Sequence, residues 1–131
     1  MSILPYRVAI CRLSPHLPIP PWATMGAFFS ITRTRYELSV VTDERNLPED
    51  VTADTGWRIL KVRGPLDLDM TGVLTSVVEP LTEHEISIFS ISTYDTDHIL
   101  VPEERLEEAI TALKKRGHEI IEAKELEEET R

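Results

Sequence analysis

The sequence predicts an α+β protein in which a complete βαββαβ unit follows a degenerate copy of the same unit. Three observations support this prediction: a repeat at constant spacing, short stretches of alternating apolar side chains, and two stretches with apolar side chains at helical spacing. Residues 28–44 align without a gap on residues 88–104. A chain of 131 residues with 41% apolar residues is long and apolar enough for one average domain or two very small ones.

The repeat includes identical residues at matching positions. Phe29, Ser30, Ile31, Val41 and Glu44 of the first copy equal Phe89, Ser90, Ile91, Val101 and Glu104 of the second. Upstream, residues 6–12 resemble residues 57–63, and both stretches alternate as strands do. Cys11, the single cysteine, lies in the first of these strands and is expected to be buried and inert. It excludes an intramolecular disulfide and suits a reducing cytoplasm.

The helices differ between the copies. In the second copy Asp69 or Thr71 can cap a helix, and Pro80 is expected to kink its last turn. Its buried face comprises Val73, Leu74, Val77, Val78 and Leu81. In the first copy the corresponding segment has four prolines, which leave room for about one helical turn near residues 21–25.

After the second hairpin, Pro102 begins another helix, Gly117 ends it, and residues 118–122 form a last strand. The first copy has only a short turn and a linker here. The second unit therefore has the ferredoxin-like order, and the first copy is available to cover its sheet. We predict a degenerate unit at residues 1–55, a complete unit at residues 56–122 and an acidic tail at residues 123–131.

The formal net charge of −9 argues against nucleic acid and anionic membranes as partners, because both bind to patches of lysine and arginine. No apolar run is long enough to cross a bilayer, and the first residues do not resemble a signal peptide. We therefore expect a cytoplasmic protein, and a cationic group would be favoured in its ligand.

A patch of hydroxyl and acidic side chains fills the turn between the second and third strands of the complete unit. The patch Thr93-Tyr94-Asp95-Thr96-Asp97 lacks glycine, which a tight turn readily uses. Strands one and three are neighbours in a ferredoxin-like sheet, so the loop at residues 64–73 is expected to lie near this turn.

The two segments together suit a free amino acid. The backbone N–H groups of Thr71, Gly72 and Val73 at the helix start favour a carboxylate. The side chains that favour an ammonium group are Asp67, Asp69, Asp95 and Asp97. The alternative is that Asp69 only caps the helix and Asp95 only shapes the turn.

Catalysis is not predicted. Residues 67–71 fit the D-x-D-x-T pattern of aspartyl-phosphate phosphotransferases, but those enzymes need a parallel doubly wound sheet that this chain is too short to form. His16, His84, His98 and His118 lack the spacing of metal ligands. We expect no metal, no cofactor and no enzymatic activity.

Several segments resemble the ACT-domain proteins of the CASTOR type. They are S-T-Y-x-T-D-x-x-L-V at residues 92–101, the flanking residues 72–104, and F-F-S-I-T-R-T and E-L-S-V-V in the first copy. The resemblance implies paired ACT units that bind a regulatory amino acid at an interface between units, without chemistry; eukaryotic members sense arginine. Met70 stands where arginine-sensing relatives can have an acid, so the resemblance does not specify arginine.

By position, the resemblance assigns eleven residues to the ligand. The loop and helix start provide Asp67, Met70, Thr71, Gly72 and Val73; the hairpin provides Thr93, Tyr94, Thr96 and Asp97; a neighbouring unit provides Ser87 and Ile88. Residues 86–92 have apolar side chains on both faces of the expected strand, whereas one buried face would require them on one face only. We therefore expect a homodimer with this strand near the interface. The alternative function is a protein–protein interaction module with a vestigial pocket and an unknown protein target.

Overall fold

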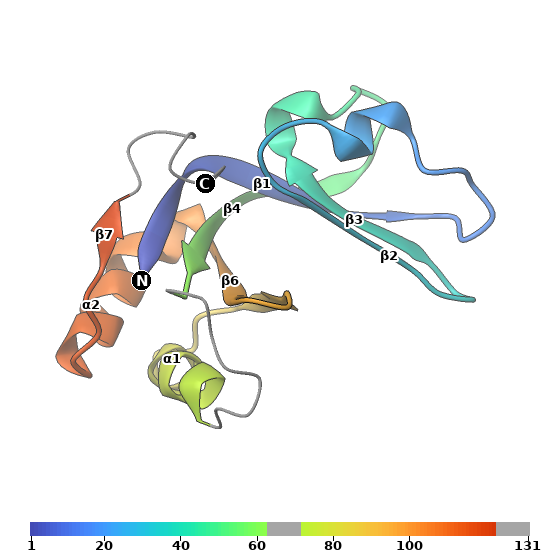
Figure 1. The fold of residues 1–131 in the computed structure, drawn as a ribbon. Coiled ribbons are helices and arrows are strands. Elements are labelled where there is room, and N and C mark those ends of the chain that lie inside the picture. Colours follow the sequence, from blue (N-terminus) through green and yellow to red (C-terminus); the bar gives the residue numbers. More distant parts are fainter. Residues whose placement is uncertain (63–71, 123–131) are drawn as a thin grey trace.

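A single seven-stranded sheet joins the two units. The computed structural model describes residues 1–62 and 72–122. The strands are β1 (Ser2–Leu13), β2 (Phe29–Arg33), β3 (Leu38–Asp43), β4 (Ala53–Lys61), β5 (Phe89–Ser92), β6 (Asp97–Pro102) and β7 (Ile121–Glu122). Their order is β2-β3-β1-β4-β6-β5, with β7 beside β1. The helices α1 (Val73–Glu83) and α2 (Leu106–Lys115) lie together on one side, and the β2–β3 hairpin extends away from them (Figure 1).

The predicted elements are present, with shifts at their ends. The helical turn of the first copy is η1 (Pro21–Thr24), a single 3-10 turn as expected for a proline-rich segment. Gly72, in a left-handed conformation with φ of 83°, precedes α1, while the predicted caps Asp69 and Thr71 lie outside the described residues. Pro80 lies inside α1, as predicted. The last helix starts later than Pro102 suggests, because the short 3-10 turn η3 (Glu103–Arg105) comes first.

Strand β1 belongs to both units. Its residues Ser2 and Ile3 pair with Lys61 and Leu60 of β4 on one side and, in parallel, with the two residues of β7 on the other. In a regular ferredoxin-like sheet the last strand would pair with the first strand of its own unit. Here the first unit's strand takes that position, so the first copy completes the sheet edge of the second.

Apolar side chains on alternate residues of the strands form cores on opposite faces of the sheet. On the helix side, Leu60, Ile99 and Val101 pack with residues of α1 and α2. On the other face, Ile59 and Leu100 pack with apolar residues of β1 and β3. A third cluster holds Cys11, Ala23, Leu38 and Val40 of the first unit. Cys11 is buried as expected, and burial raises the pKa of its thiol.

Strand β5 uses both of its faces within the chain. Ile86 and Ile88, just before it, pack in the helix-side core, and Phe89 and Ile91 pack against the opposite core. The apolar side chains that suggested a dimer interface here are therefore accounted for inside one chain. In the parts that the structure covers, no helix is long and apolar enough to span a membrane.

Candidate ligand-binding site

Hydrogen bonds of Thr93 stabilise the β5–β6 turn, which contains no glycine. The N–H of Thr93 donates to the carbonyl of Thr96 at 2.8 Å, and the N–H of Thr96 donates to the hydroxyl of Thr93 at 3.2 Å. The same hydroxyl donates to the Thr96 carbonyl at 3.0 Å. Part of the hydroxyl-rich patch is thus explained by the turn itself.

Thr96 ties the turn to the end of β4. Its side chain is buried, and its hydroxyl donates to the carbonyl of Val62. The N–H of Val62 in turn donates to the carbonyl of Asp97 at 2.9 Å. The turn therefore lies beside the end of β4, at the last described residue before the predicted ligand loop. The three loop residues assigned to the ligand, Asp67, Met70 and Thr71, lie outside the described residues.

The carboxylate of Asp97 is oriented by a neighbour on the adjacent strand. The hydroxyl of Ser92 donates to Oδ1 of Asp97 at 2.5 Å, and the Asp97 side chain is half-buried. Within residues 1–62 and 72–122, Asp97 has no ion pair with a lysine or arginine. Tyr94, in the same turn, is 80% exposed. An oriented carboxylate that has no lysine or arginine partner among the described residues suits an ammonium group.

The other assigned residues are distributed over two regions. Gly72 is exposed immediately before α1, and Val73 packs partly against the helix-side core. Ser87 and Ile88 precede β5 and therefore lie at the end of this strand away from the turn. Ser87 borders a separate hollow of about 440 Å³ that also contains Asp54 and Glu104, among others. One chain therefore places the turn beside the end of β4 and leaves Ser87 and Ile88 at the opposite end of β5.

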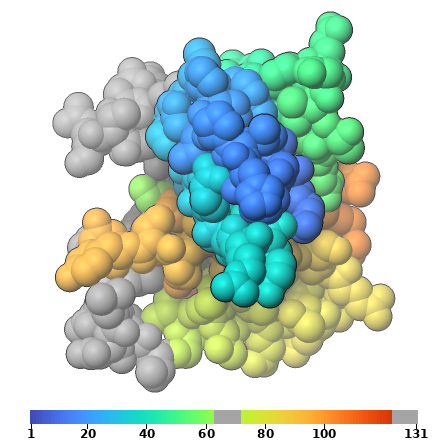
Figure 2. All heavy atoms as spheres, turned by 90° about the vertical axis from the view of Figure 1, so that its right-hand side faces the viewer, coloured from blue at the N-terminus to red at the C-terminus, as the bar shows by residue number. Residues whose placement is uncertain are grey.

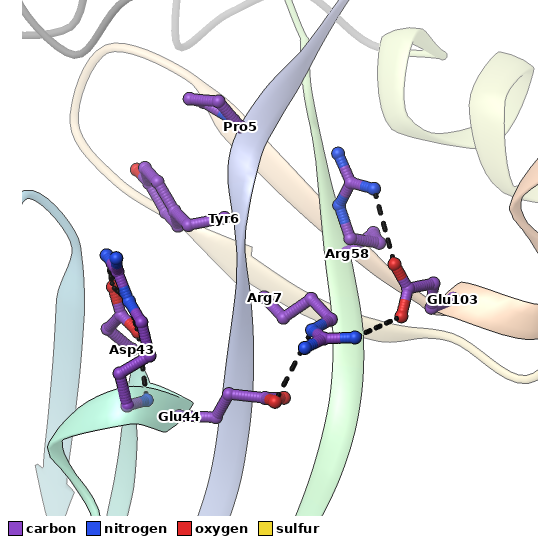
Figure 3. Close-up of a pocket in the computed structure, with 8 residues that line it drawn as sticks. Pro5, Tyr6, Arg7, Asp43, Glu44, Arg58 and Glu103 are labelled. Atoms are coloured by element: carbon purple, nitrogen blue, oxygen red, sulfur yellow. Dashed lines mark hydrogen bonds and ion pairs between the residues drawn. The ribbon is translucent and has the colours of Figure 1, made fainter.

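A cluster of ion pairs, not predicted from the sequence, lies between the two units. Arg7 of β1 and Arg58 of β4 stand directly opposite each other. Nη1 of Arg7 donates to Glu103 at 3.0 Å, and its Nε lies 3.4 Å from Glu44 (Figure 3). Nη1 of Arg58 lies 3.6 Å from Glu103. The hydrogen bond that Arg7 donates to Glu103, and after it the negative charge of Glu44, raises the pKa of Arg7.

This cluster joins the two units, and its two arginines are balanced by two glutamates. Glu44 belongs to η2 (Glu44–Asn46) of the first unit, whereas Glu103 begins η3 of the second. The neighbouring cavity has a volume of about 290 Å³, and its guanidinium groups already face carboxylates. The sequence repeat contains one indication of this cluster: Arg7 and Arg58 occupy matching positions in residues 6–12 and 57–63. We interpret the cluster as structural.

A nearby ion pair predicts a dependence of stability on pH. Asp43 is 7% exposed and caps η2, and its hydrogen bonds from the Arg45 side chain lower the pKa of its carboxyl. Stability from this pair is complete above the ordinary aspartate pKa of about 3.9 and is lost as the pH falls through the lower folded-state pKa. Urea unfolding should therefore show Asp43→Asn less stable than the wild type at pH 7, with the difference shrinking below about pH 4. A difference that is the same at both pH values would contradict this assignment.

Among the described residues no group of three or more His, Cys, Asp or Glu side chains is arranged to hold a metal ion. Nothing in this part of the chain therefore indicates a metal site.

Comparisons with known proteins identify related sequences in both units. The family model described as the ACT domain matches residues 52–115, and one for an N-terminal domain matches residues 7–50. The cytosolic arginine sensor for mTORC1 subunit 1 from Bos taurus is 33% identical over 104 residues, which are 73% of this chain and 32% of that protein. The Homo sapiens protein of the same name is 33% identical over 68% of this chain and 30% of its own length. The chain thus spans about a third of these curated relatives.

Solved structures share the fold over nearly the whole chain. Protein Atu0741 from Agobacterium tumefaciens has a TM-score of 0.89 at 42% identity, covering 95% of this chain and 92% of that one. The regulatory subunit of aspartate kinase from Thermus thermophilus has a TM-score of 0.58 at 9% identity, covering 86% and 94%. At that identity the second comparison shows the fold alone.

Proposed function

Because the chain belongs to the ACT-domain proteins of the CASTOR type, we propose that it is a non-catalytic regulatory protein that binds a free amino acid at an interface between ACT units. The observation that supports this most directly is the carboxylate of Asp97, oriented by Ser92 beside the end of β4. Curated relatives are named as arginine sensors, and similar folds occur in regulatory subunits of aspartate kinase.

The chemistry of the site fits a zwitterion. Asp97 accepts the ammonium group, and the backbone N–H groups at the start of α1, at Gly72 and Val73, face the carboxylate. Ser87 and Ile88 come from the corresponding unit of a second copy, since they lie away from the turn in their own chain. The proposal therefore includes a homodimer in the cytoplasm and a protein target that receives the signal.

A thermal-shift screen with the twenty proteinogenic amino acids tests this proposal. A ligand present at 100 times its Kd stabilises the folded state by roughly 2.7 kcal/mol, which gives a clear rise in melting temperature. We expect such a rise with one amino acid or a few related ones. Melting that no amino acid changes would favour the alternative, an interaction module with a vestigial pocket.

A further inference from the structure

Strand β5 and the β2–β3 hairpin border a groove that the amino-acid site does not use. Its volume is about 260 Å³. The hairpin contributes Ser30, Thr32, Ser39 and Val41, and β5 contributes all of its residues, Phe89–Ser92. We call this feature the β5 groove. In Figure 2 the hairpin, in cyan, lies directly above the yellow segment that leads into β5.

The β5 groove follows the outer edge of β5 and not one of its faces. Successive side chains of a strand point to opposite faces, so consecutive residues border one cavity only if the cavity lies along the strand's edge. Phe89 and Ile91 pack inside the chain, but β5 is the last strand of the sheet order and its outer edge has no partner strand among the described residues. The backbone N–H and C=O groups of this edge are therefore available to a molecule in the groove.

The outer edge of β5 is poorly protected against pairing. Proteins commonly block such edges with lysine, proline or a bulge, or keep them very short. Apart from its length of four residues, β5 has none of these features: its sequence is Phe-Ser-Ile-Ser, and its register with β6 is continuous. The edge is thus open to another extended chain.

The side chains that border the β5 groove are all uncharged, although charged residues make up 28% of the chain. The hydroxyl of Ser92 donates to Asp97. The other hydroxyls have no hydrogen-bond partner in the described part of the chain, and they belong to Ser30, Thr32, Ser39 and Ser90. A charged group placed here would lose hydration without gaining an opposite charge, whereas amide and hydroxyl groups would find partners.

We propose that the β5 groove binds an extended, uncharged segment of a partner protein, which pairs with β5 as a further strand. In strand addition the main-chain hydrogen bonds provide affinity, and alternate side chains provide specificity. Phe89, Ile91 and Val41 belong to the core on the sheet face opposite the helices, so that face of an added strand is turned toward the hairpin. Its side chains there meet hydroxyl groups and are expected to be small or hydroxyl-bearing, while those on the other face stay exposed.

The proposal is compatible with the amino-acid site and does not depend on it. Ser87 and Ile88, which the proposed dimer uses, do not border the β5 groove. A partner segment on β5 therefore leaves both residues to the neighbouring unit. The same groove would serve the alternative function, an interaction module with a vestigial pocket.

Fluorescence anisotropy of the full chain with dye-labelled peptides tests the proposal. The probes have blocked ends and alternate threonine with valine or isoleucine, because these residues favour strands. The wild type is expected to bind them and not to bind the same peptides methylated on every backbone nitrogen, which cannot donate to β5. Ser90→Lys should weaken binding at least about tenfold, because a lysine on the edge opposes strand pairing and the hydrogen bonds to the edge are lost. Ser76→Lys is the matched control, the same change at an exposed serine of α1.

Amide hydrogen exchange measured by nuclear magnetic resonance locates the contact. The peptide should slow exchange of the β5 N–H groups on the outer edge by at least about tenfold, and leave α1 and α2 unchanged. A wild type that binds none of the peptides would overturn the proposal, and so would equal binding by Ser90→Lys and the wild type when both melt at the same temperature. Outer-edge amides that are already protected without peptide would assign the edge to a second copy, which would overturn it as well.

Discussion

Replacing Leu60 with alanine is expected to lower the free energy of unfolding by about 2–5 kcal/mol. Leu60 is fully buried in the helix-side core, and it stands opposite Ile3 where β1 and β4 pair. Truncation leaves a cavity between the sheet and the two helices, which the surrounding strands cannot close because they are hydrogen-bonded on both sides. The measurement is urea unfolding followed by circular dichroism, with the wild type and the variant compared at a common slope.

Leu17→Ala is the matched control, since it makes the same change in a side chain that is 48% exposed. Its effect should stay within about 0.5 kcal/mol, the usual range for surface substitutions. Equal losses in the two variants would contradict the assignment of Leu60 to the centre of the core.

Replacing Asp97 with alanine is expected to weaken amino-acid binding by roughly 10- to 150-fold, which corresponds to about 1.5–3 kcal/mol for a charge-assisted hydrogen bond. The substitution removes the only oriented carboxylate that the turn presents beside the end of β4. The melting temperature without ligand should barely change, because the contact that ties the turn to Val62 is made by Thr96 and by the backbone of Asp97.

Calorimetric titration with the amino acid found in the thermal screen measures this effect. Asp95→Ala is the control, because Asp95 is exposed nearer the tip of the turn. If the wild type and both variants bound the ligand with equal affinity, the acidic patch would be an exposed turn and nothing more.

Much of the fold could be predicted from the sequence because local periodicity determines it. The alternation in residues 6–12 and 57–63, the prolines before residue 22 and the helix signals around Gly117 all produce the elements that the structure contains. The pairing of β1 with β7 could not be predicted, since it joins residues far apart in the chain and β7 has only two residues. A local sequence pattern predicts that a strand forms, but it does not predict which other strand will pair with it.

The site was predicted only in part, for a different reason. Residue types marked the turn at residues 93–97 as unusual, but they do not tell which hydroxyl points inward. The sequence could not show that the hydroxyl of Thr96, a residue assigned to the ligand, is buried and donates to the Val62 carbonyl. The ion pairs of Arg7 and Arg58 were missed because their acids come from two separate 3-10 turns, whose proximity is a property of the folded chain.

The position of β1 between β4 and β7 also constrains how the chain can fold as it is synthesised. Residues 2 and 3 leave the ribosome long before residues 121 and 122, which form the strand that flanks them on one side. The sheet edge at β1 therefore remains open until residues 121 and 122 have emerged. Pairing over such sequence separation is slow, because loop-closure entropy is lost before the contact is gained. The nascent protein thus exposes a strand edge until β7 is made, and an exposed edge can pair with other chains.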